Sequence, residues 1–248
     1  MKKPNFTLGI EPDKIAKKVL LTSDPELCAY VAEKYMKNYE AFNVNRNYPG
    51  FTGTYFGKPV TVISAGIGMG AMGLLAEELY QVCGVDSVIY ISTCDGLKEE
   101  VKTLDCVLAL SASTDSNYPD LLGLPGAVSP TADFELTEAL LLDFKKRKEA
   151  VFAECDATNI HVGPVLSSDR RVTDPLEAEE WAECGTLAAD MATAALFVQA
   201  MKAGKKAASL LLIDKNVITG TEMPSTEMRY KAPQFPLMRQ IVIALSVL

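Results

Sequence analysis

The stretch VTVISAGIGMGAMGLLAEEL at residues 60–79 decides the fold of this chain. Its first five residues are apolar or small and predict a buried strand, and residues 74–79 have the composition of a helix. The glycine-rich turn between them holds Gly66, Gly68, Gly70 and Gly73. Glycine lets the backbone approach a ligand, and the unpaired N–H groups of a helix N-terminus favour electron-rich atoms. The turn either packs a helix closely on a strand or cradles a ligand, and four glycines within eight residues favour the cradle.

Strands and helices alternate on both sides of this stretch. Apolar runs predict further strands at residues 18–22, 51–56, 59–64, 87–92, 105–110, 160–166 and 207–213. Helical patterns cover residues 25–36, 134–148, 174–183, 191–203 and 236–248, and residues 121–130 predict an irregular loop. This alternation predicts an α/β fold, a sheet with helices on both faces.

Several predictions concern the ends of these elements. Asp24 is expected to cap the helix that starts at Pro25, and Gly57-Lys58 is expected to form the turn of a hairpin. Asp214 is expected to close the strand that ends at residue 213. In α/β folds ligands gather at the carboxyl ends of strands. The candidate ligand positions are therefore Ser23, Gly66, Thr93, Ser168 and Asp214.

Composition narrows the class of protein. The 248 residues are 48% hydrophobic and 23% charged, as in an ordinary globular protein, and we expect one domain over residues 1–248. The net charge of −8 argues against nucleic acid as a partner, and the KKRK run at residues 145–148 is expected on the solvated side of a helix. No apolar run reaches the ~18 residues of a membrane span, and the start lacks a signal-peptide core, so we expect a cytoplasmic protein.

Cysteine and histidine usage narrows the chemistry. The six cysteines form no CxxC pair and are expected to be reduced core residues. The only histidine is His161, so a metal site built on several histidines is excluded, and no metal is expected. His161 lies in a predicted strand and is expected to be a packed or edge residue.

The run Gly68-Met69-Gly70-Ala71-Met72-Gly73 also matches GxGxxG, the fingerprint of dinucleotide-binding domains. Asp95 would then be the acid that binds the ribose. Other strands precede the run, the glycines begin early at Gly66, and Asp95 is predicted to lie in a loop. An NAD-dependent dehydrogenase is therefore the weakest of the hypotheses considered.

A collinear set of segments carries a resemblance across nearly the whole chain. In order they are FTLGI, VLLTSDPE, NRNYPGFTGTYFGKPV, SAGIG, EEL, SSD and EEWAECG. Together they resemble the nucleoside phosphorylase superfamily, especially the uridine phosphorylases and the hexameric purine nucleoside phosphorylases. The resemblance implies a mixed, twisted central β-sheet flanked by helices, and it places the glycine turn, with Gly66, around the ribosyl and phosphate region.

The resemblance also implies phosphate-binding positions. Arg46 corresponds to an arginine that the neighbouring subunit contributes across a dimer interface, and Thr93 matches a phosphate-binding Ser or Thr. Ser23, at the start of the SDPEL segment, is a further phosphate-binding candidate. The other two family arginines are replaced here by Leu27 and Tyr90. Guanidinium groups bind oxyanions bidentately, so these replacements remove much of the expected phosphate affinity.

The implied ribose and base positions are mixed in the same way. Met191 is retained at the sugar, but the glutamate that follows it in the family is Ala192, and the N-terminal histidine of uridine phosphorylases is Thr7. Ser168 keeps the SSD pattern at the base. Asp214 matches the aspartate that protonates the base in purine-specific members; an Asp at a strand end also caps turns, and both roles stay open.

Three hypotheses follow from the resemblance. The first is a nucleoside phosphorylase, a pentosyltransferase for uridine or a purine nucleoside, with phosphate as co-substrate, no cofactor, and Arg170, Arg171 or Lys215 supplying charge. The second is a phosphate-independent nucleosidase with an acid such as Glu26 as base. The third is an inactive homologue that acts as a binding or partner subunit. The family also implies a homodimer or a trimer of dimers, with Arg46 reaching the neighbouring site.

Overall fold

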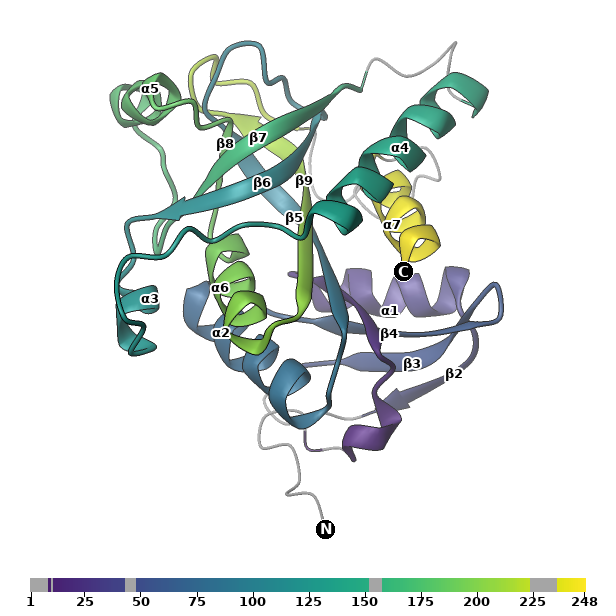
Figure 1. Cartoon of the computed structure of the whole chain (residues 1–248). Helices are drawn as coiled ribbons and strands as arrows, with labels where there is room; N and C mark the ends of the chain where they lie inside the picture. The colour runs from purple at the N-terminus through teal and green to yellow at the C-terminus, as the bar shows by residue number, and fades with distance from the viewer. Residues whose placement is uncertain (1–8, 10, 43–47, 152–157, 224–235) are drawn as a thin grey trace.

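The computed structural model describes residues 9, 11–42, 48–151, 158–223 and 236–248. The strands shown in Figure 1 are β1 (Lys18–Thr22), β2 (Lys37–Phe42), β3 (Gly50–Tyr55), β4 (Lys58–Ser64), β5 (Ser87–Gly96), β6 (Cys106–Thr114), β7 (Ile160–Ser167), β8 (Ala188–Asp190) and β9 (Lys206–Asn216). The α-helices are α1 (Pro25–Tyr35), α2 (Met69–Glu77), α3 (Tyr118–Leu121), α4 (Phe134–Val151), α5 (Pro175–Glu183), α6 (Thr193–Ala203) and α7 (Pro236–Val247). A 3₁₀ turn at Pro12–Lys14 precedes β1, and a π-helical turn at Glu78–Val82 extends α2.

The strands form one mixed sheet in the order β2-β3-β4-β1-β5-β8-β7-β6-β9. β9 also pairs with β5, so the five strands from β5 to β9 close into a ring. β1 runs parallel to both β4 and β5, whereas β8 runs antiparallel to β5. β5 thus belongs both to the open part of the sheet and to the ring, and it is the strand that the other parts share.

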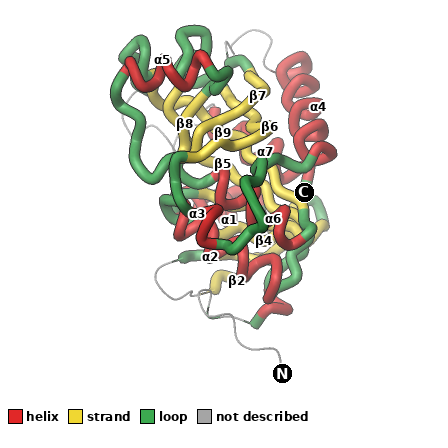
Figure 2. The backbone as a smooth tube through the Cα atoms, turned by 60° about the vertical axis from the view of Figure 1, so that its left-hand side comes forward, coloured by secondary structure: helices red, strands yellow, loops and turns green. Residues whose placement is uncertain are grey.

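Helices cover the sheet on two sides (Figure 2), as the sequence predicts. Successive side chains of a strand point to opposite faces, and β1 shows this clearly. Val19 and Leu21 join one buried cluster together with residues of α2 and α6. Leu20 joins the other, together with residues of α1, α4 and α7. The predicted α/β architecture is confirmed.

The glycine turn is shorter than the sequence predicts. The helix begins at Met69 rather than after Gly73, so the turn spans only the residues between Ser64 and Met69. Gly66 and Gly68 have φ of 70° and 98°, values that favour glycine. Gly73 lies inside α2, where a Cβ would sit 1.8 Å from the hydroxyl oxygen of Tyr118. Two glycines therefore shape the turn, and a third allows α3 to approach α2.

The predicted hairpin is confirmed with a shift of one residue. Tyr55 pairs with Lys58, so the turn is Phe56-Gly57 instead of Gly57-Lys58. Both turn residues have positive φ, 45° and 80°, as in the tight turns that match the twist of paired strands. The sequence did not predict β2 or β8. β2 is almost wholly exposed and lacks an apolar alternation, and β8 has only three residues.

β5, β6 and β9 each continue at least three residues further than predicted, and in β5 and β9 this changes the setting of an acid. β5 continues to Gly96, so Asp95 lies within a strand, not in a loop, and is buried. β9 continues to Asn216, so Asp214 does not close the strand. Cys28, Cys83, Cys94 and Cys106 are buried free thiols as expected, but Cys184 is exposed.

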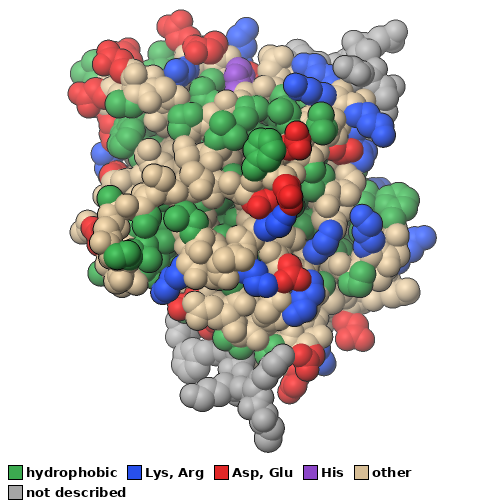
Figure 3. Space-filling model, in the orientation of Figure 1, with side chains coloured by type: hydrophobic (Ala, Val, Ile, Leu, Met, Phe, Trp, Pro, Cys, Tyr) green, Lys and Arg blue, Asp and Glu red, His purple; other side chains and the backbone are tan. Residues whose placement is uncertain are grey.

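Charged side chains of both signs are intermixed on the face shown in Figure 3. Acidic side chains gather over α5, which carries Glu177, Glu179, Glu180 and Glu183. In the KKRK run, Lys145 and Lys146 are exposed on α4, which confirms the predicted solvated side. Within the described residues, no helix is long and apolar enough to span a membrane.

Candidate functional site

A cavity of about 210 Å³ opens at the carboxyl ends of β1, β5 and β9. β8 runs in from the opposite direction and brings Asp190 and Met191 to its wall, while the glycine turn contributes Ile67 and Gly68. In α/β sheets, ligands bind in the crevice outside the carboxyl ends of the strands. The cavity therefore lies where the strand order predicts a ligand.

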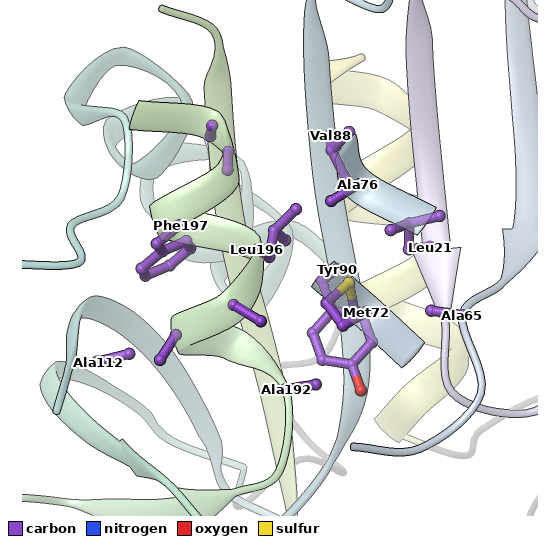
Figure 4. Close-up of a cluster of buried hydrophobic side chains, with 14 of the residues drawn as sticks. Leu21, Ala65, Met72, Ala76, Val88, Tyr90, Ala112, Ala192, Leu196 and Phe197 are labelled. Carbon is purple, nitrogen blue, oxygen red and sulfur yellow. The ribbon is translucent and has the colours of Figure 1, made fainter. Parts of the chain in front are cut away.

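One part of the cavity, which we call the neutral end, consists of Ser23, Tyr90, Ser92 and Thr93. The Ser92 hydroxyl donates to the Ser23 hydroxyl at 2.8 Å. Tyr90 is 3% exposed; burial raises its pKa, and hydrogen bonds with Ser92 and Ser23 oppose that rise. In Figure 4 its ring lies among buried hydrophobic side chains. This part of the wall offers hydroxyl groups and no charge.

The other part, which we call the charged end, consists of Asp95, Arg170, Arg171 and Asp214. Arg171 grips Asp95 with two bonds, from Nη2 to Oδ1 at 2.7 Å and from Nε to Oδ2 at 3.3 Å. Hydrogen bonding and attraction to Asp95 raise the pKa of Arg171, and Asp214 adds to the rise. Because Tyr90 and Asp95 occupy successive parts of β5, the two ends follow one another along that strand.

Asp214 owes its position to a bulge in the pairing of β5 with β9. Cys94 pairs with Ile213, but Asp95 pairs with Lys215, so Asp214 is the extra residue between them. A bulge interrupts the side-chain alternation of a strand and re-aims one side chain. Asp214 is half-buried and lines the cavity, and its carbonyl oxygen accepts from the Met223 amide at 2.7 Å. The bulge explains how a residue inside a strand reaches the cavity.

Asp190 lies in the same wall but is tied to the backbone of the next helix. Its Oδ2 accepts from the amides of Ala192 and Thr193 at 3.2 and 2.9 Å and from the Thr193 hydroxyl at 2.6 Å. Its Oδ1 accepts from the Ser167 hydroxyl at 2.5 Å. Burial raises the pKa of Asp190, and these four bonds oppose the rise. Asp190 thus holds the start of α6, a structural role.

The side chains that replace an arginine and the glutamate of the family carry no charge and are buried. Leu27 is 1% exposed and packs in the cluster beneath α1. Ala192 is 1% exposed, in the same buried cluster as Tyr90 (Figure 4). Three cationic side chains proposed to supply charge are already ion-paired: Arg170 with Glu177, Arg171 with Asp95, and Lys215 with Glu222.

The predicted site residues divide into three groups. Ser23, Thr93, Met191 and Asp214 line the cavity together. Gly66 lies in the turn directly before Ile67, and Ser168 is buried and donates to Asp115 at 2.9 Å, so neither forms the wall itself. Arg46 lies outside the described residues, and so does Thr7, the position where uridine phosphorylases have a histidine.

Among the polar wall residues, Ser92 and Asp190 were not singled out from the sequence, and Asp95 was considered only as the ribose-binding acid of a dinucleotide site. Ser92 and Asp95 are polar residues near the end of an apolar strand, and this pattern could have marked them as site residues. His161 is elsewhere, with its Nε2 2.8 Å from Asp105 Oδ2, as expected of a packed residue. Within the described residues, no group of three or more His, Cys, Asp and Glu is arranged to hold a metal ion.

Comparisons with known proteins agree on the family. Residues 17–234 match the model of the phosphorylase superfamily. The chain is 36% identical over 221 residues to a DeoD-type purine nucleoside phosphorylase of Alkaliphilus metalliredigens, covering 89% of this chain and 91% of that protein. It is 34% identical over 220 residues to the DeoD-type enzyme of Bacillus subtilis, covering 89% and 91%.

A solved structure agrees on the fold. Uridine phosphorylase from Vibrio fischeri superimposes with a TM-score of 0.83 at 23% identity, covering 98% of this chain and 96% of that one. The dehydrogenase hypothesis is wrong, since the GxGxxG run lies in a chain of another family. By both sequence and fold, the chain belongs to the phosphorylase superfamily.

Proposed function

We propose that the chain cleaves the N-glycosidic bond of a nucleoside by phosphorolysis, releasing the free base and ribose 1-phosphate. The observation that carries this proposal is the meeting of Ser23, Thr93, Met191 and Asp214 in one cavity. These residues come from widely separated parts of the sequence. The names of the relatives, purine nucleoside and uridine phosphorylases, support the same reaction.

In the proposed reaction a phosphate oxygen forms a bond to C1′ of the ribose as the bond from C1′ to the base nitrogen breaks. The electron pair of the breaking bond moves into the base, and Asp214, in its protonated form, gives the base a proton. Ser23 and Thr93 donate hydrogen bonds to phosphate, and Met191 contacts the sugar. Gly66 gives the turn its shape beside the sugar and phosphate, and Ser168 holds the loop before Arg170 through its bond to Asp115.

Arg46 is the remaining candidate for a cation at the phosphate. We propose that it reaches the site of a neighbouring subunit in a homodimer or a trimer of dimers. We also propose that the enzyme uses no cofactor, takes phosphate as its co-substrate and works in the cytoplasm. The proposed partners are thus the nucleoside, phosphate and further copies of the chain.

The neutral end supports a second candidate, hydrolysis. Leu27 and Tyr90 are uncharged, and a charge-assisted hydrogen bond contributes about 1.5–3 kcal/mol, so phosphate affinity is expected to be weak without Arg46. A hydrolase needs no phosphate, because water attacks C1′. Glu26, considered as its base, is exposed on α1 and is not among the cavity-lining residues. Hydrolysis is therefore less well supported than phosphorolysis.

One assay separates the candidates. The protein is incubated with uridine, inosine and adenosine, with and without phosphate, and release of free base is measured. Phosphate-dependent release, with ribose 1-phosphate as the second product, supports phosphorolysis. Release without phosphate supports the nucleosidase. No release from any of the three contradicts both and favours an inactive homologue with a binding or partner role.

A further inference from the structure

At the charged end of the cavity, Arg171 has more N–H donors than Asp95 uses. Arg171 has five N–H donors, and Asp95 takes one from Nε and one from Nη2. Among the bonds that the described residues make, none uses the two hydrogens on Nη1 or the second hydrogen on Nη2. These three donors remain for a ligand. The side chain is 58% exposed, whereas Asp95 beside it is 8% exposed. The carboxylate therefore fixes the guanidinium while leaving one edge of it open to the cavity.

Asp214 provides a second donor beside this edge. Both side chains line the same cavity, and Asp214 is one of the charges that act on Arg171. In the proposed reaction Asp214 gives a proton to the base, and the neighbouring guanidinium favours this step because it stabilises the carboxylate that is left. The base thus meets two neighbouring donors, a carboxylic acid and a guanidinium. A complementary base must present two neighbouring acceptors.

Nucleobases differ on this point. A 6-oxopurine presents N7 and O6 side by side, and both are acceptors. Adenine presents N7 as an acceptor, but its neighbour is the 6-amino group, a donor that opposes another donor. Uracil-type bases present O4 beside a carbon, so they offer one acceptor on that edge. Only the 6-oxopurine edge satisfies both donors.

We propose that Arg171 is a specificity-determining residue that selects 6-oxopurine nucleosides, such as inosine, by donating to O6 while Asp214 donates to N7. The proposal rests on the proposed function for the role of Asp214. It narrows the substrate to 6-oxopurine nucleosides, whereas the names of the relatives say only purine nucleoside or uridine. Asp95 is then a positioning residue, since it acts on the base only through Arg171.

The test measures binding of free bases, so it does not depend on turnover. Hypoxanthine and adenine are titrated calorimetrically into the full-length protein and into the variant Arg171→Met. The wild-type protein should bind hypoxanthine about 10-fold more tightly than adenine or better. Arg171→Met should weaken hypoxanthine binding about 10-fold and leave adenine binding within about twofold. Arg147→Met, which removes an arginine paired with Asp143 on α4, is the matched control and should change neither affinity.

The selectivity ratio separates recognition from a structural role. If the ion pair only anchored its loop to β5, Arg171→Met would weaken both bases equally. Should that variant fail to fold because Asp95 is left unpaired, the double variant Asp95→Asn/Arg171→Met avoids a lone carboxylate and should lose the same selectivity. Equal affinities of the wild-type protein, equal losses in the variant, or no hypoxanthine binding up to millimolar concentration would each overturn the inference.

Failure of this inference and failure of the proposed function give different results. Phosphorolysis of inosine and adenosine with equal kcat/KM would overturn the inference and leave the function standing. Selective binding of hypoxanthine that is lost in Arg171→Met, without turnover of any nucleoside, would uphold the inference and contradict the function.

Discussion

The two ends of the cavity differ in how their polar groups are held. At the neutral end the hydroxyls of Ser23 and Ser92 bond to each other, and Tyr90 is buried beside them. At the charged end Arg171 is fixed by Asp95 but keeps free donors, and Asp214 is placed by a bulge. The charged end is therefore prepared to recognise a ligand, whereas the neutral end provides only uncharged hydrogen-bonding groups. Under the proposed function, the described residues therefore provide more of a base-binding site than of a phosphate-binding site.

The largest expected effect concerns Asp214 at the charged end. Asp214→Asn removes the proton donor and should lower kcat/KM for inosine by about 10²–10⁴-fold, as measured for general acids. Phosphorolysis is followed by release of hypoxanthine at saturating phosphate. Asp120→Asn, an exposed residue of α3, is the control and should match the wild-type rate. A rate for Asp214→Asn within threefold of wild type would remove Asp214 from the mechanism.

The next effect separates Asp190 from Asp214, two carboxylates of the same wall. Asp190→Ala should lower the free energy of unfolding by about 2–5 kcal/mol, because it leaves buried donors at Ala192, Thr193 and Ser167 without their acceptor. Urea unfolding measures this, with Asp120→Ala as the control. Asp214→Asn should change stability far less. If Asp190→Ala were as stable as wild type, the structural role of Asp190 would be wrong.

A smaller effect is expected at the neutral end. Ser23→Ala removes a hydroxyl proposed to bind phosphate and should raise KM for phosphate about 10- to 100-fold, the value of one hydrogen bond to a charged group. The KM for the nucleoside should change less. Ser129→Ala, an exposed loop residue, is the control. An unchanged KM for phosphate would move the phosphate site away from the Ser23–Ser92 pair.

The smallest effect is a pH dependence of stability. Burial raises the pKa of Asp190 above the ordinary value of 3.8, so the unfolded chain releases this proton at lower pH than the folded chain does. The stabilising contribution is fully present below the ordinary value and is lost as the pH rises through the folded value. Relative to Asp190→Asn, the wild-type protein should therefore lose stability across that window. Urea unfolding from pH 4 upward measures the difference, and parallel curves for the two proteins would exclude a raised pKa.

Sequence patterns predicted the longer strands and helices that have an apolar face, and they missed β2, which lacks such a face, and β8, which has only three residues. β9 and α6 are almost wholly buried, and their apolar runs located them. β2 has exposed side chains at nearly every position, so no alternation marks it, and it exists because β3 provides a pairing edge. Glycines hid the start of α2, since Gly70 and Gly73 lower helix propensity while close packing against Tyr118 requires a small residue at position 73.

The candidate site was predicted in part for similar reasons. Ser23 follows from the general location of ligands at strand ends in α/β folds, and Thr93 was predicted on the same ground although β5 continues past it to Gly96. The bulge that aims Asp214 depends on the register between β5 and β9, and local sequence does not determine register across distant strands. The pairing of Arg171 with Asp95 brings together residues far apart in the chain. The proposed contact with the base therefore depends on the fold, which places both residues at the cavity.

The shared position of β5 has a consequence for folding and for ligand binding. β5 pairs with β1, β8 and β9, so the cavity exists only after contacts between distant parts of the chain have formed. High contact order of this kind slows folding, because the entropic cost of closing long loops comes before the stabilising contacts form. A nucleobase that binds this cavity should therefore stabilise the protein against global unfolding rather than against local opening. The stabilisation is about 2.7 kcal/mol at a ligand concentration of 100 Kd. Hydrogen exchange of the β5 amides should slow in proportion to that stabilisation.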